Sequence, residues 1–212
     1  MAKRCLDILV SAAAIAILSP LILCIALSVA VTSNGGPLFR QIRMGIHGRR
    51  FTILKFRSMT VSPSTHSSNF TPGQTTRVTG IGRILRKTKL DELPQLWNVL
   101  RGDMSLVGPR PEVPEWTDAH PERWKIVLSV RPGITDPASI EFRDEESMLA
   151  SADDPEACYR DVILPRKLDL SEAYVRERSF LGDLAILART LTTVLGGRDA
   201  GPEGGVRGEC RE

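Results

Sequence analysis

Acidic residues are missing from most of the N-terminal half of the sequence. No Asp or Glu occurs between residues 8 and 90, a span of 83 residues that contains eleven Lys or Arg. Residues 1–90 therefore carry a formal charge of +12 and residues 91–212 carry −9, which together give the net charge of +3. A basic half of this kind indicates contact with anionic lipid headgroups, with phosphates, or with both.

Aromatic residues are also scarce, at 5% of the chain. Few of them lie between the basic residues, and no nucleic-acid-binding motif is present, so we expect no nucleic acid partner. The four cysteines are widely scattered, and no pair has the spacing of metal ligands. We therefore expect a reduced protein that faces the cytoplasm, without a disulfide framework.

Charge is absent from residues 8–31, a run of 24 residues. As a helix this run would be about 36 Å long, enough to cross a hydrocarbon core of ~30 Å. It is too long for a typical signal-peptide core, and no convincing cleavage site follows it. Ser19 and Pro20 lie at its middle, and Pro20 is expected to kink the helix because it lacks a backbone donor.

Two topologies are open for this segment. A kinked helix that spans the bilayer explains its length and Pro20. A helix that enters and leaves the same leaflet at the Ser19-Pro20 break also explains why basic residues flank both ends, since such residues prefer the cytoplasmic side. The sequence favours this re-entrant form over the spanning one. The flanking basic residues are Lys3, Arg4, Arg40, Arg43, Arg49 and Arg50.

The first carboxylates after the basic run are Asp91 and Glu92. Pro94 and the apolar residues after it predict a helix that begins at or near Asp91 and ends at Gly102. In that position the positive end of the helix dipole would lower the pKa of Asp91. An Asp at a helix start is often only a cap. An isolated acidic pair within a strongly basic region instead indicates a site that gathers anionic ligands.

The remaining chain predicts a small domain. Short strands are expected around residues 51–54 with a turn at 45–48, a loop or lid at 58–79, and an extended polar segment at 135–144. Helices are expected at 113–129, 155–164, 168–178 and 179–195. The fold expected is α/β, mostly α with short strands, on amphipathic interfacial helices. The expected divisions are a membrane helix–break–helix at 1–36, a catalytic domain at 37–195 and a disordered tail at 196–212.

Four sequence blocks resemble a known family. They are KFRSM (55–59), LDELPQLWNVLRGDMSLVGPRP (90–111), RPGIT (131–135) and an LD…YV…S…DL..L..T pattern around 169–190. Together they are similar to the bacterial sugar transferases, also called monotopic phosphoglycosyl transferases. The likeness covers almost everything from Lys3 to about Leu195 and includes the Ser-Pro break. It corresponds to the minimal, catalytic-domain form of that family.

The resemblance implies transfer of a sugar 1-phosphate from a UDP-sugar to a polyprenol phosphate, with release of UMP. It implies that Asp91 is the nucleophile, that an aspartyl-phosphosugar forms, and that Glu92 helps to bind Mg²⁺ beside Asp91. Adjacent residues at a helix start point about 100° apart, so one carboxylate can face phosphorus while the other faces a metal ion. It also implies a place on the cytoplasmic face of the bacterial inner membrane, against anionic lipids.

Further site residues are expected on the donor phosphates. Arg86 and Arg110 are the first candidates, followed by Lys55 and Arg57, whose spacing of two places them on one side of a strand. For each of these cations, a surface salt bridge or solvated face is the alternative. Other candidates are Pro109 and Pro111 beside Arg110, and Asp144 and Asp169, which match aspartates of the family but could equally be surface charge.

Some questions stay open at this level. Residues 134–145 (ITDPASIEFRDE) depart from the family's ITGWAQVNGR, so the identity of the sugar is not predicted. The oligomeric state is open as well, a homodimer included. A nucleotide-sugar hydrolase and a catalytically silent membrane adaptor are the rival functions. The intact DELPQ sequence argues against the adaptor, because a silent relative has no need for Asp91.

Overall fold

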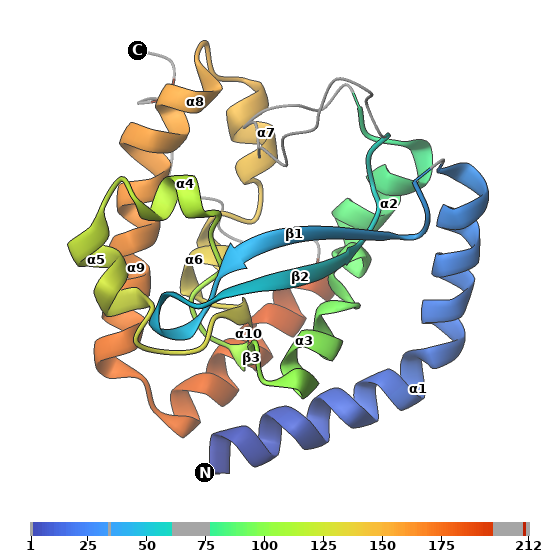
Figure 1. The fold of residues 1–212 in the computed structure, drawn as a ribbon, viewed down its shortest axis with the longest axis horizontal. Coiled ribbons are helices and arrows are strands. Elements are labelled where there is room, and N and C mark those ends of the chain that lie inside the picture. Colours follow the sequence, from blue (N-terminus) through green and yellow to red (C-terminus); the bar gives the residue numbers. More distant parts are fainter. Residues whose placement is uncertain (1, 34, 61–76, 197–209, 211–212) are drawn as a thin grey trace.

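The computed structural model describes residues 2–33, 35–60, 77–196 and 210 (Figure 1). The expected lid at 58–79 and the expected tail at 196–212 therefore lie largely outside the described residues. The elements are α1 (Ala2–Thr32), β1 (Leu38–Met44), η1 (Ile46–Gly48), β2 (Arg50–Phe56), α2 (Gly80–Thr88), η2 (Leu90–Glu92), α3 (Gln95–Arg101), β3 (Ser105–Val107), α4 (Pro114–Thr117), α5 (Pro121–Val127), β4 (Gly133–Thr135), α6 (Pro137–Glu141), α7 (Glu145–Ala150), α8 (Pro155–Cys158), η3 (Tyr159–Ile163), α9 (Leu164–Glu177) and α10 (Phe180–Gly196).

Two small sheets lie among the helices, which confirms a mostly helical fold with short strands. β1 and β2 form an antiparallel hairpin in which Leu38 pairs with Phe56 and Met44 with Arg50. The hairpin and its glycine-containing turn confirm the strands predicted here. β3 and β4 form a short parallel pair (Ser105 to Gly133, Val107 to Thr135). Figure 1 shows the hairpin crossing the middle of the molecule, with α9 at one end and α2 at the other.

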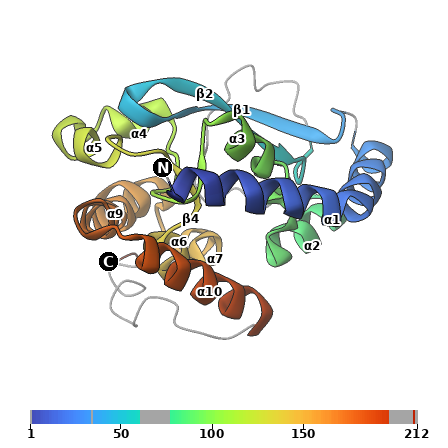
Figure 2. The ribbon, with the colours of Figure 1, turned by 90° about the horizontal axis from the view of Figure 1, so that it is seen from below.

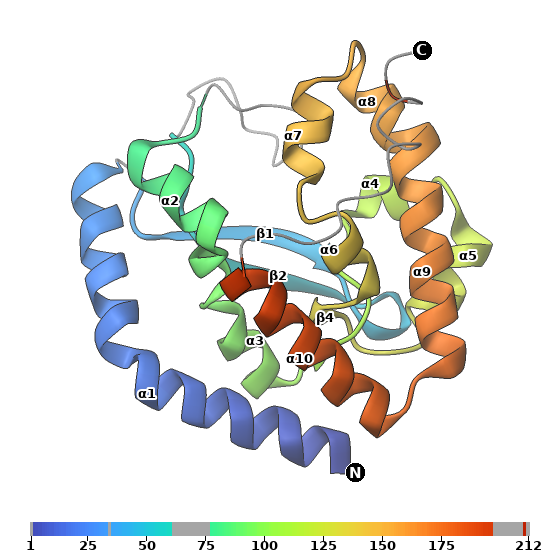
Figure 3. The same cartoon turned by 180° about the vertical axis from the view of Figure 1, so that it is seen from behind.

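The apolar segment forms a single long helix, α1, that contains Pro20. Figures 1 and 3 show that this helix changes direction near its middle, as the Ser19-Pro20 pair predicts. The Ser19 hydroxyl donates to the carbonyl of Ala16 at 2.9 Å, which uses one acceptor of the turn before Pro20. Among the described residues, α1 is the one helix long and apolar enough to cross a membrane.

The start of α1 is fixed to the rest of the protein by polar contacts. Asp7 is buried and accepts hydrogen bonds from the Ser105 hydroxyl (2.9 Å) and from the Leu106 backbone N–H (3.1 Å). Arg4 donates to the carbonyls of Val99 and Leu100, which stand at the end of α3. These contacts hold the first two turns of α1 against α3 and β3.

The second half of α1 packs against the same body. Ile25 and Val29 are buried in one apolar cluster with Phe56 of β2 and Leu85 of α2. Both halves of the bent helix therefore contact the domain that carries β2 and α3. Most of the apolar side chains between these two contacts are exposed, including Ile17 at 76% and Leu23 at 59%.

Several local predictions were wrong. Residues 135–144 are not extended, because Asp136 caps a short helix, α6, with Pro137 in its first turn. α3 begins at Gln95 rather than near Asp91, although Gly102 ends it with φ of +93° as predicted. The gap expected between the helices at 155–164 and 168–178 is absent, because Pro165 lies in the first turn of α9, directly after the π-helical turn η3.

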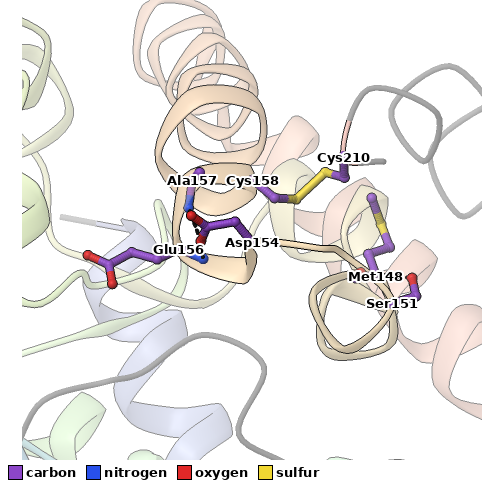
Figure 4. Close-up of a disulfide and its surroundings, with 7 residues drawn as sticks. All are labelled: Met148, Ser151, Asp154, Glu156, Ala157, Cys158 and Cys210. Atoms are coloured by element: carbon purple, nitrogen blue, oxygen red, sulfur yellow. Dashed lines mark hydrogen bonds between the residues drawn. A yellow bond between two sulfur atoms is a disulfide. The ribbon is translucent and has the colours of Figure 1, made fainter. Parts of the chain in front are cut away.

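The expectation of a chain without disulfides was also wrong. Cys158 and Cys210 form a disulfide between α8 and the C-terminal tail, across 52 residues of sequence (Figure 4). Their separation along the chain hid the pairing, because it says nothing about where the tail returns. Cys5 and Cys24 are free and exposed.

Two glycines allow the close approach of the backbones beside the paired strands β3 and β4, which is called the β3–β4 crossing here. A Cβ added to Gly133 would lie 2.1 Å from the backbone nitrogen of Gly108, and a Cβ on Gly108 would lie 2.4 Å from the carbonyl oxygen of Arg131. Both contacts are to backbone, so a rotamer change cannot relieve them. The crossing matters for the site, because Gly133 donates to Pro109 and β4 leads into Asp136.

We expect Gly133→Ala to destabilise the fold by about 3 kcal/mol, since backbone must move to admit the methyl group. For a chain of this size that corresponds to a fall in Tm of about 6–12 °C. Gly80→Ala is the control, because a Cβ there would meet nothing within 4 Å. Thermal unfolding in detergent measures both variants. Equal Tm values for the two would contradict the close approach.

Candidate active site

Asp91 and Glu92 lie in the 3-10 turn η2, between α2 and α3. Lys89 ends α2 in the left-handed conformation, with φ of +58°, and so turns the chain sharply before the acidic pair. Both carboxylates are buried, with 7% of Asp91 and 9% of Glu92 exposed. The turn thus carries two adjacent acids into the interior, where each needs a partner.

Glu92 finds its partners in two cations from distant parts of the chain. Lys55 of β2 donates to Glu92 Oε1 at 2.8 Å, and Arg110 donates to the same oxygen at 2.5 Å. A second nitrogen of Arg110 lies 3.4 Å from Glu92 Oε2. Burial alone would raise the pKa of Glu92, but Arg110 and Lys55 outweigh it and hold the pKa well below its usual range. Glu92 is therefore ionised at neutral pH.

Asp91 has no such partner. Among the described residues, nothing hydrogen-bonds its buried Oδ1 atom. Burial raises the pKa of Asp91, and neighbouring Lys55 only partly offsets this effect. The lowered pKa expected from the helix dipole was wrong, because α3 begins four residues later and desolvation is the larger effect. The result is an under-solvated carboxylate oxygen beside Lys55 and Arg110.

Arg110 lies in the irregular segment between β3 and α4, residues 108–113, which is called the Arg110 turn here because it redirects the chain. Its backbone N–H donates to the buried carboxylate of Asp136 at 3.3 Å, and the carbonyl of Pro109 accepts from Gly133. The carbonyl of Pro111 accepts from Arg43 of β1 at 3.2 Å. The turn is therefore tied to β4, α6 and β1, which leaves the guanidinium to point at Glu92. Its pKa is raised because Glu92 stabilises the charged form.

The structure thus brings four expected residues together: Asp91, Glu92, Lys55 and Arg110. The other cations have different partners. Arg57 donates to the backbone carbonyls of Gly35, Gly36 and Leu38, where it fixes the link between α1 and β1. Arg86 pairs with Glu146 of α7 at 2.5 Å, and both side chains are partly exposed.

The remaining acidic candidates lie elsewhere. Asp169 forms an ion pair with Arg123 at 2.6 Å and its side chain is 59% exposed. Asp144 precedes α7 and makes no side-chain capping bond there. Sequence reasoning overlooked Asp136, Glu112 and Asp7, which are buried and hydrogen-bonded. The Asp136-Pro137 pair is a cap signal that could have identified the first of these.

The site can be tested for its fit to a divalent ion. The described residues contain no group of three or more His, Cys, Asp or Glu placed to hold a metal ion. Mg²⁺, however, usually binds through one or two carboxylates together with substrate phosphates. The unpartnered Oδ1 of Asp91 suits such a site. Glu92 suits it only after giving up a contact with Lys55 or Arg110, since these cations occupy its oxygens.

Comparison with known proteins places this chain in a family. The family model described as bacterial sugar transferase matches residues 1–197. The UDP-N-acetylgalactosamine-undecaprenyl-phosphate N-acetylgalactosaminephosphotransferase of Aeromonas hydrophila is 36% identical over 198 residues, which cover 92% of this chain and 44% of that protein.

Other relatives carry similar names. The UDP-glucose:undecaprenyl-phosphate glucose-1-phosphate transferase of Klebsiella pneumoniae is 36% identical over 197 residues, 89% of this chain and 39% of the relative. The protein of that name from Caulobacter vibrioides is 36% identical over 196 residues, 91% of this chain and 69% of the relative. The chain thus spans less than half of the first two relatives. The match along nearly its whole length shows that it belongs to the bacterial sugar transferase family.

Proposed function

We propose that the protein transfers a sugar 1-phosphate from a UDP-sugar to undecaprenyl phosphate or a similar polyprenol phosphate, releasing UMP. The carrying observation is the buried, unpartnered Oδ1 of Asp91 beside a carboxylate that holds Lys55 and Arg110 in place. Transfer of this kind needs a nucleophile and cations that neutralise a diphosphate. The names of the relatives supply the two substrate classes.

The first step is attack by a carboxylate oxygen of Asp91 on the phosphorus that bears the sugar. A P–O bond to aspartate forms, the bond from that phosphorus to the bridging oxygen breaks, and the electron pair leaves with UMP. Lys55 and Arg110 offset the charge on the transferred phosphoryl group. A bound Mg²⁺ would supply further charge neutralisation at the diphosphate.

The second step regenerates the protein. An oxygen of the polyprenol phosphate attacks the same phosphorus, and the bond to Asp91 breaks, which returns the electron pair to the carboxylate. The product is a polyprenyl-diphosphate sugar. Two half-reactions through a covalent intermediate give ping-pong kinetics. This order also lets the water-soluble UMP leave before the lipid substrate is bound.

We also propose that α1 is re-entrant and that the catalytic body lies on the cytoplasmic face of the inner membrane. Asp7 near the start of α1 and Val29 near its end both contact this body, so a spanning helix would have to release one of them. Figure 2 shows α1 and α10 along the same side of the molecule. In α10, Leu181 is 76% and Leu191 61% exposed, which suits shallow contact with lipid.

We expect Asp91→Asn to lower UMP release by a factor on the order of 1,000 or more, because the nucleophile is lost. Removal of divalent ions with EDTA should also abolish release, and added Mg²⁺ should restore it. Purified protein is incubated with a panel of UDP-sugars and polyprenol phosphate, and UMP and lipid-linked product are measured. Asp169→Asn is the control, since that carboxylate is exposed and paired with Arg123.

The same assay separates the rival functions. UMP with free sugar phosphate and no lipid product would indicate a hydrolase, and no UMP with any sugar would indicate an adaptor. Substantial activity of Asp91→Asn would remove this residue as the nucleophile.

Asp91→Asn should also raise stability at neutral pH, measured with EDTA present. Burial raises the pKa of the folded-state Asp91, so its stabilising contribution is present below its unfolded pKa of about 3.9 and is lost as pH rises through the folded pKa. The variant avoids that loss. Its Tm should exceed the wild-type Tm at pH 8, and the gap should narrow as the pH falls toward about 4. Asp118→Asn controls for loss of an exposed carboxylate. A gap independent of pH would argue against a desolvated Asp91.

The proposed topology predicts that both ends of α1 are reached from one side. Cys5 and Cys24 are replaced by serine, and single cysteines are placed by Ala2→Cys and by Ser129→Cys in the soluble body. A membrane-impermeant maleimide should label both in inverted vesicles and neither in right-side-out cells. Labelling from opposite sides would refute the re-entrant form. Replacing Ser19 and Pro20 by alanines should shift labelling of position 2 to the outside and lower activity.

A further inference from the structure

A largely buried polar cluster lies behind the Arg110 turn and takes no direct part in the proposed reaction. Its members are Arg43 of β1, Glu112 near the end of the turn, and Tyr159 at the start of η3. We propose that these three side chains position Arg110 for the donor phosphates, so that Tyr159 and Arg43 act on the reaction through Arg110. This inference rests on the proposed transfer reaction and names the residues that set the geometry of its cation.

Glu112 connects Tyr159, Arg43 and the backbone of the Arg110 turn. Its Oε2 accepts from the Tyr159 hydroxyl at 2.6 Å, and its Oε1 accepts from Arg43 at 3.0 Å and from the Val113 backbone N–H at 2.9 Å. Its backbone carbonyl accepts from the N–H of Met44 at 2.9 Å. One residue two positions beyond Arg110 is thus held by β1 on one side and by η3 on the other.

Arg43 extends this hold to the turn itself. The nitrogen that binds Glu112 also donates to the carbonyl of Pro111 at 3.2 Å, next to Arg110. Its other nitrogens donate to the side-chain oxygen of Gln41 at 2.7 and 3.1 Å, which fixes the plane of the guanidinium. A planar, forked donor that bridges a side chain and a backbone carbonyl transmits position better than a single bond does.

The opposite edge of the turn is fixed independently. Gly133 donates to the carbonyl of Pro109, and Asp136 accepts from the N–H of Arg110. With Arg43 on Pro111, the backbone on both sides of Arg110 is therefore tied down. The side chain then reaches Glu92 with one contact of 2.5 Å, and small shifts of the turn would change that contact.

Burying these charged and polar groups costs free energy of desolvation, so the cluster is a poor source of stability. Burial lowers the pKa of Arg43, and burial followed by Glu112 raises the pKa of Tyr159 well above its ordinary value, so each group pays for leaving water. Buried ion pairs of this kind often stabilise no better than apolar residues of the same volume. Supporting contacts that orient the residue touching the substrate are a better explanation, and their loss typically costs 10–100-fold in function.

The test is a double-mutant cycle between Tyr159 and Arg110. Tyr159→Phe removes one hydroxyl, and we expect about a tenfold fall in kcat/KM for the UDP-sugar in an otherwise wild-type protein. In an Arg110→Ala background the same change should cost less than about twofold, because nothing remains to be positioned. Single-turnover UMP release at high protein concentration keeps the slow variants measurable.

Tyr174→Phe is the matched control. Tyr174 is another buried phenol, but its hydroxyl donates to Asp183 at 2.8 Å, with the Val107 carbonyl of β3 more distant at 3.3 Å, and it makes no contact with Arg43 or Glu112. A merely structural loss should lower Tm and change kcat/KM by the same factor in both backgrounds. If Tyr159→Phe also shows one equal factor in both backgrounds, the positioning role is wrong. If the wild-type protein releases no UMP at all, the proposed function fails first.

A second variant keeps the proposal testable if Tyr159→Phe does not fold. Arg43→Lys keeps a positive charge for Glu112 but loses the fork that reaches Gln41 and Pro111. It should likewise lower kcat/KM for the UDP-sugar in the wild-type protein and have a smaller effect in the Arg110→Ala background. Calorimetric titration with a UDP-sugar, in an Asp91→Asn background that prevents turnover and well below the Tm of each variant, gives a readout independent of catalysis. Weaker UDP-sugar binding by about fivefold or more in Arg43→Lys, absent in the Arg110→Ala background, supports positioning. Unchanged binding overturns it.

Discussion

Glu92 is clamped between Lys55 and Arg110, and most of the site depends on this arrangement. The three residues come from an acidic turn, from β2 and from the loop after β3, so their meeting fixes these segments relative to one another. Because both cations donate to Glu92, the buried Oδ1 atom of its neighbour Asp91 has no hydrogen-bond partner among the described residues. A carboxylate that is costly to keep charged is also one that gains from forming a bond to phosphorus.

Helix α1 also contacts the segments that carry Lys55 and Arg110. Asp7, near the start of α1, binds β3, and β3 leads directly into the turn that carries Arg110. Val29, near the end of α1, packs on Phe56, next to Lys55. The first half of α1 therefore contacts β3, which precedes Arg110, and the second half contacts the end of β2, which carries Lys55. If α1 lies in a membrane as proposed, these contacts link the position of the helix to the geometry of the site.

Local signals predicted much of this structure. The glycine turn between two apolar-basic stretches gave the β1–β2 hairpin, and Ser19-Pro20 predicted the bend of α1. The pKa direction of Asp91 could not be predicted, because it depends on burial by segments far away in sequence. The same holds for Cys158 and Cys210, and for the cluster around Glu112. Spacing shows which side chains share an element, but the partners here lie on different elements.

The bent helix also has a consequence for the fate of the product. If α1 dips into a single leaflet as proposed, this helix offers no path for a sugar diphosphate through ~30 Å of hydrocarbon. The charged head of the lipid would then stay in the leaflet where it was made, since moving it across unaided is prohibitively costly. Outward movement would then need a path that α1 does not form.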